Sequence, residues 1–191
     1  IVEANTPECQ EGLATAGNFF YSPTKESFKE VEVSVMAISR GFRAKANDPK
    51  DPNKIKFNQI MAGMMISEMK PFIMFFSGTR LTRLWDFGKE IKPFTSHKIA
   101  PFPMFALRVK MGIEKVKTDY GYNHVATFSL VKDDAGKIQV INDIELAQML
   151  RSNIAKMEDL FDKFISQKEV VVTAPRSSSA ITEIDGEDVA F

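Results

Sequence analysis

The sequence predicts a mixed α+β domain in which strands dominate. We expect a five-stranded barrel with one helix between its third and fourth strands, followed by a long amphipathic helix and a flexible acidic tail. Several short segments alternate apolar and polar residues, as strands with one buried face do, whereas two other segments carry apolar residues at helical spacing. A chain of 191 residues with 44% hydrophobic residues can form one globular domain with extensions.

The first half of the domain is predicted to hold three strands and a helix. Val31, Val33, Val35 and Ala37 alternate with other residues and are expected on one strand face. The predicted strands span residues 31–39, 55–67 and 72–77, and a loop with two Asp-Pro pairs spans 46–54. A helix is predicted over 79–91, capped by Thr79, and Trp85 lies on its apolar stripe and is expected to be buried.

The second half begins after a connector that contains Pro93, Pro101 and Pro103. Alternation then predicts strands at 105–113 and 120–131, a turn at 133–136, a short strand at 138–141 and an edge strand at 170–172. The helix expected over 143–166, with Asn142 as its cap, carries a broad apolar stripe. We therefore divide the chain into an N-terminal extension (1–29), the domain (30–173) and a linker with an acidic tail (174–191).

Basic residues are concentrated in this domain and lie among aromatic ones. Between residues 24 and 117 there are 18 lysines or arginines, 9 acidic residues and 11 phenylalanine or tryptophan rings. Cations release the counterions of phosphates, and flat rings accept stacked bases without reading their sequence. We therefore expect a groove for single-stranded nucleic acid, while most of the rings serve in the core. The residues expected to line the groove are Arg40, Phe42, Arg43, Lys45, Lys54, Lys56, Arg80, Arg83, Arg108, Lys110, Lys115, Lys117, Tyr120 and Tyr122.

The formal net charge of zero hides a basic body and an acidic tail. All 25 lysines and arginines lie at or before Arg176, and four acidic residues follow it. The chain closes on Phe191. Such a tip can insert its ring and carboxylate into a basic-rimmed apolar pocket on a partner, or fold back onto the protein's own cationic groove. It can also be a solubilising terminus.

The predicted order of three strands, a helix and two strands is that of an oligonucleotide-binding (OB) fold, and a less specific α+β domain is the alternative. Together with the linker and the acidic tip, it resembles the single-stranded DNA-binding proteins of bacteria and especially of their phages. The resemblance implies that Asp185, Glu187, Asp188 and Phe191 recruit replication or recombination proteins and compete with DNA for the groove. The tip departs from the bacterial pattern, because Val189-Ala190 stands where an Ile-Pro pair is common, and the body carries no matching residue-level motif. A phage version is therefore favoured.

Other chemistry has little support in the sequence. Two histidines and one cysteine show no zinc-ligand spacing, and neither a phosphate-binding P-loop nor a dinucleotide-binding glycine motif is present. We predict no cofactor, no metal and no enzymatic activity. A single cysteine cannot form an internal disulfide, which favours a reducing, cytoplasmic location in the host, and the apolar runs are too short to span a membrane.

The function expected from these observations is sequence-tolerant binding of single-stranded DNA in replication or recombination. A homo-oligomer is compatible with it. The first alternative is a phage structural or assembly protein that uses the long helix and the Met-rich strands for subunit contacts. The second, weaker alternative is a metal-dependent nuclease or another nucleic-acid enzyme.

Overall fold

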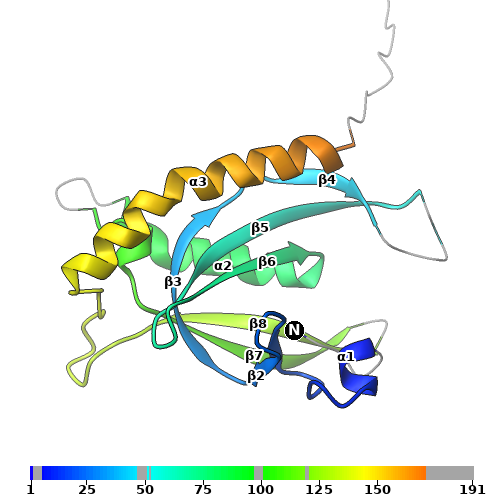
Figure 1. Cartoon of the computed structure of the whole chain (residues 1–191), viewed down its shortest axis with the longest axis horizontal. Helices are drawn as coiled ribbons and strands as arrows, with labels where there is room; N and C mark the ends of the chain where they lie inside the picture. Colours follow the sequence, from blue (N-terminus) through cyan, green and yellow to red (C-terminus); the bar gives the residue numbers. More distant parts are fainter. Residues whose placement is uncertain (2–5, 47–50, 52, 97–100, 119–120, 171–191) are drawn as a thin grey trace, which may run out of the picture.

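The computed structural model describes residues 1, 6–46, 51, 53–96, 101–118 and 121–170. Over these residues the protein is mixed α+β, with a six-stranded antiparallel sheet, a two-stranded hairpin and three α-helices (Figure 1). The strands are β1 Phe19–Tyr21, β2 Glu26–Phe28, β3 Val31–Ile38, β4 Phe42–Lys45, β5 Ile55–Met65, β6 Lys70–Ser77, β7 Val109–Thr118 and β8 Gly121–Leu130. The helices are α1 Pro7–Gln10, α2 Thr79–Thr95 and α3 Ile144–Lys168, with a 3₁₀ turn η1 at Met104–Ala106.

The sheet is built around β5. Strands β3 and β4 follow one another along the same edge of β5, so that Ile38 pairs with Met61 and Phe42 with Asn58. Strand β6 pairs with the opposite edge of β5, while β7 pairs with β3 and β8 pairs with β7. The order across the sheet is therefore β6, β5, β3 with β4, β7, β8. The predicted strands at 31–39, 55–67, 72–77 and 120–131 are confirmed as elements.

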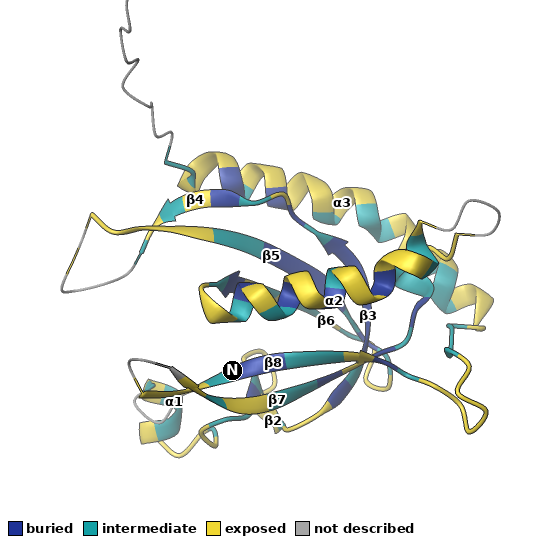
Figure 2. Ribbon diagram, turned by 180° about the vertical axis from the view of Figure 1, so that it is seen from behind, coloured by how far each residue is buried: buried dark blue, intermediate teal, exposed yellow. Residues whose placement is uncertain are grey.

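Over the described residues the sheet is open, whereas an OB-like five-stranded barrel was predicted. Among the described residues no ladder joins the end strands β6 and β8, and α2 lies between them (Figure 2). Side chains bridge the gap instead. The ring of Phe128 on β8 lies 6.0 Å from that of Phe76 on β6 and 5.1 Å from that of Phe87 on α2. Because α2 fills the space between the end strands, their backbones do not pair.

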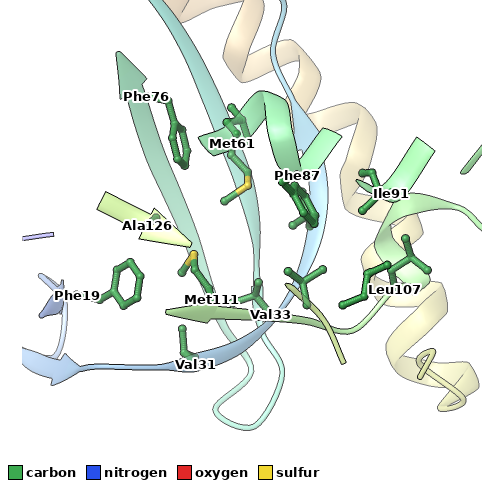
Figure 3. Packing of buried hydrophobic residues seen from close by; sticks show 14 of the residues in the cluster. Phe19, Val31, Val33, Met61, Phe76, Phe87, Ile91, Leu107, Met111 and Ala126 are labelled. Carbon is green, nitrogen blue, oxygen red and sulfur yellow. The ribbon is translucent and has the colours of Figure 1, made fainter. Parts of the chain in front are cut away.

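Two apolar clusters lie on the two faces of the sheet. The larger packs α2 against β3, β5, β6, β7 and β8, with Val33, Met61 and Leu107 fully buried (Figure 3). The smaller packs α3 against β3, β4 and β5 through residues that include Phe161 and Ile165. Each helix therefore buries its apolar stripe on a different face of the same sheet.

A β-bulge between Val35 and Ala37 distributes β3 over both clusters. Val31, Val33 and Val35 face the α2 cluster, whereas Ala37 faces the α3 cluster. The prediction that all four share one face was wrong. One extra residue in a strand moves every following side chain to the opposite face.

The N-terminal segment contributes to the core, although it was predicted to be a loop-prone extension. Strands β1 and β2 form a hairpin, and Phe19 is buried in the larger cluster beside residues of β3, β7 and β8 (Figure 3). A ring at this position covers apolar surface at the open side of the sheet. The cluster is therefore completed by residues outside the predicted domain.

Several predicted ends and caps differ by a few residues. Asp143, not Asn142, caps α3, and its side chain accepts a hydrogen bond from the Leu146 amide at 3.0 Å. Thr79 is the first helical residue of α2 instead of its cap, and the helix runs past Pro93.

The segments beside β7 and β8 also differ from prediction. Phe105 belongs to η1 instead of a strand, and residues 138–141 make only isolated bridges. The predicted turn at 133–136 is confirmed, because the Asp133 side chain accepts hydrogen bonds from the Ala135 and Lys137 amides. No helix among the described residues has the length and apolarity that crossing a bilayer requires.

Candidate nucleic-acid interface

Strands β4 and β5 form a hairpin arm with cations and rings on one face. Arg43 pairs with Phe57 and Lys45 with Ile55, and directly paired residues project their side chains to the same face. Both cations are exposed, and Phe57 and Ile55 keep 43% and 42% of their surface accessible. This face of the arm therefore combines positive charge with accessible apolar surface.

The ring of Phe57 meets Trp85 of α2 on this face. Their centroids lie 6.3 Å apart with the planes inclined by 56°, and Trp85 is 49% exposed. The indole Nε1 donates a hydrogen bond to Gln59 Oε1 at 2.8 Å, and Gln59 Nε2 donates to the Ser39 carbonyl at 3.0 Å. The polar edge of the indole is thus satisfied inside the protein, while half of its surface stays available. We call these two rings the Phe57–Trp85 platform.

A glycine determines where the platform lies. A Cβ atom at Gly41 would stand 1.9 Å from the Phe57 ring, so only glycine allows this ring to lie against the chain.

On the other side of the platform, Trp85 borders a shallow cavity of about 280 Å³. Lys89 and Lys92 of α2 also line that cavity. Cations therefore flank the platform from both the arm and the helix.

A second exposed ring lies at the end of the β7–β8 hairpin. Tyr122 is 62% exposed, and Lys115 Nζ lies 4.8 Å from its ring centroid. Lys117 pairs directly with Tyr122 and is exposed. The β4–β5 and β7–β8 hairpins extend toward the same side of the molecule in both views (Figures 1 and 2).

Phe42 does not belong to this surface, and its predicted stacking role was wrong. Its exposed fraction is 3%, and its ring packs edge-on against Phe164 of α3 at a centroid distance of 6.4 Å. Strand β4 turns Phe42 and Ala44 toward α3, and it turns Arg43 and Lys45 the other way. Lys56 pairs with Ala44, so it points to the α3 side as well.

Several predicted phosphate contacts are engaged within the protein. Arg108 donates hydrogen bonds to the Glu32 carboxylate and to Gln139, and Lys110 lies 2.7 Å from Glu30. Arg83 of α2 lies 2.7 Å from the Glu114 carboxylate of β7. These pairs tie strands and helix together at partly exposed positions, where each contributes little stability by itself. The acidic partners largely neutralise the charge of these three cations, so they are less suited to bind phosphate than was predicted.

Arg40 fixes the end of α3 to the start of the arm. Its guanidinium makes two hydrogen bonds to the Glu169 carboxylate, at 2.9 and 2.7 Å. These bonds hold the pKa of Glu169 below its usual value and raise the pKa of Arg40. The next amide, that of Val170, donates to the Arg43 carbonyl at 2.8 Å. Glu169 and Val170, which directly follow α3, therefore hold the free edge of β4.

The other predicted residues are divided between surface positions and undescribed ones. Lys54 is exposed at the start of β5, and Arg80 is partly buried in the first turn of α2. Tyr120 and the predicted edge strand beyond Val170 lie outside the described residues, as do Asp185, Glu187, Asp188 and Phe191 of the tip.

Sequence reasoning missed the platform. Trp85 was expected to be buried because it lies next to Leu84 at helical spacing, but Leu81, Leu84, Phe87 and Ile91 already complete the buried stripe of α2. A signal was available, since those four residues follow a 3–3–4 spacing that excludes Trp85. Phe57 carried no such signal.

Comparison of the chain with protein-family models, curated proteins and solved structures gave no match. Among the described residues, no group of three or more histidine, cysteine or acidic side chains lies close enough to hold a metal ion.

Proposed function

We propose that this protein binds single-stranded DNA without sequence preference, on an OB-type sheet, in replication or recombination. The observation that carries the proposal is the Phe57–Trp85 platform, two half-exposed rings held beside exposed Arg43. Unpaired bases can stack on such rings, and a cation beside them can follow the phosphates. Bases in a duplex are already stacked and leave no face for the platform.

The topology supports the OB-type assignment. Three consecutive antiparallel strands (β3 with β4, β5, β6) precede α2, and the β7–β8 hairpin follows it and returns to β3. OB folds bind nucleic acid with the loops after their first and fourth strands. The corresponding hairpins here, β4–β5 and β7–β8, extend to one side (Figure 1). Phe57 lies on the first hairpin and Tyr122 on the second. A strand bound between them would meet both Phe57 and Tyr122.

The acidic tip supplies a second function in this proposal. Its four carboxylates and terminal ring would compete with DNA for the basic face and recruit replication or recombination proteins in the host cytoplasm. Assembly through Met-rich strands has less support, because Met61 and Met65 are buried in the core. Enzymatic activity forms no part of the proposal.

A titration tests the proposal directly. The sole tryptophan of the chain belongs to the platform, so its fluorescence should fall when oligo-dT stacks on it. Affinity for oligo-dT should decrease steeply as salt rises, because phosphate binding releases counterions. No quenching together with salt-independent binding would remove the basis of the proposal, and duplex DNA of equal length is the control.

A further inference from the structure

A large groove runs along the free edge of β6. Its volume is about 700 Å³, within the range of pockets that hold ligands. It lies between β6 and the β1–β2 hairpin, and Met157 of α3 also lines it. Phe19, Val31, Met111 and Ala126, which gather at one end of the cluster in Figure 3, line its floor. We call this space the β6 groove.

The strand beside the groove has an unpaired backbone edge. All eight residues of β6 pair with β5 on one edge, and no hydrogen bond from the other edge is found within the described part of the chain. An uncovered edge presents alternating amide donors and carbonyl acceptors. Edge strands are usually protected from pairing with other chains by prolines, charged side chains or bulges, and β6 has few of these. Pro71 lies near the start of the strand, and the large apolar side chains Ile73 and Phe75 are about half exposed.

The hairpin that forms the other wall is anchored to the start of β6. The Lys70 ammonium donates a hydrogen bond to the Glu26 carboxylate of β2 and lies 5.8 Å from the ring centroid of Tyr21 on β1. Phe19 is held in the core at the same time. The groove therefore has a fixed wall and a fixed floor before any ligand arrives.

We infer that the β6 groove binds an extended, apolar peptide segment of a partner protein, which adds to the edge of β6 as a further strand. The backbone edge requires a ligand with its own alternating donors and acceptors, and a hydrocarbon chain has none. The lining is almost entirely aromatic and aliphatic, and Arg80 is the one charged side chain among the described residues that line it. Nucleic acid, with a phosphate at each residue, is therefore a poor fit.

The geometry also favours a particular peptide pattern. Every second side chain of an added strand would point toward Phe72, Met74 and Phe76, so apolar residues should alternate with others. Because the β1–β2 hairpin forms the wall that faces β6, a lone strand fits the groove better than the edge of a second folded sheet.

The experiment uses the full chain and a fluorescein-labelled peptide of eight residues that alternates valine with threonine. We expect saturable binding by anisotropy, and slower hydrogen exchange of the β6 amides at residues 70–77 when the peptide is present. A peptide N-methylated at alternate amides should not bind, because it cannot pair with a strand edge. Binding of the N-methylated peptide with equal affinity, or binding without amide protection, would overturn the inference.

Matched variants locate the site. Ile73→Lys places a charge at the groove and should abolish peptide binding, whereas Ile144→Lys, at a position 71% exposed on α3, should leave it unchanged. Both should keep oligo-dT binding, so failure of this inference is distinguishable from failure of the proposed DNA function. A wild-type dimer in sedimentation that Ile73→Lys converts to a monomer would assign the groove to a second copy and overturn the peptide inference.

Discussion

Replacing Phe57 by alanine should weaken DNA binding without unfolding the protein. The ring is 43% exposed and contacts the ring of Trp85, so truncation removes a stacking surface and little core. Loss of one base–ring stack costs about 1–3 kcal/mol. At 1.4 kcal/mol per factor of ten, this corresponds to a dissociation constant for oligo-dT raised about 5- to 150-fold.

The assay is an oligo-dT titration at low and high salt, followed by anisotropy and by Trp85 fluorescence. Phe75→Ala is the matched control, because Phe75 is 52% exposed on β6 but contacts Phe164 on the α3 face. The control should keep wild-type affinity. The salt dependence of Phe57→Ala should also match wild type, since no cation is lost. A folded Phe57→Ala variant with unchanged affinity would refute the placement of DNA on the platform.

Four further predictions concern charge and packing. Phe42→Ala should lower the free energy of unfolding by about 3–5 kcal/mol in chemical denaturation, because it empties a core position under α3; a loss below 1 kcal/mol would contradict the burial. Arg43→Ala should reduce the slope of log affinity against log salt by about one in oligo-dT titrations. Hydrogen bonds from Arg40 lower the pKa of Glu169, so its contribution to stability is present at neutral pH and is lost as pH falls through the lowered pKa. Unfolding curves of wild type and Glu169→Gln should therefore converge on acidification. A chain ending at Arg176 should bind oligo-dT more tightly than the full chain at low salt, and the difference should fade at high salt; equal affinity at low salt would favour a solubilising tail.

Local patterns determined most of the elements of this protein. The apolar stripe of α3 and the alternation in β8 predicted both elements to within a few residues, because a periodic run leaves one arrangement that buries its apolar face. The turn at 133–136 was equally local, since Asp133 bonds to amides two and four residues away. The charge division between body and tail is likewise a property of the sequence.

Only the tertiary structure decided which aromatic rings are exposed and can stack with bases. Phe42 and Phe57 both lie in alternating strands beside basic residues, so the sequence offers no reason to prefer one as a stacking residue. The face that each strand presents depends on the bulge between Val35 and Ala37 and on the side that α3 covers. Both depend on contacts between segments far apart in the chain. A shift of one residue moves every following side chain of a strand to the opposite face of the sheet. Packing of α3 thereby buries Phe42 and leaves Phe57 exposed beside Trp85.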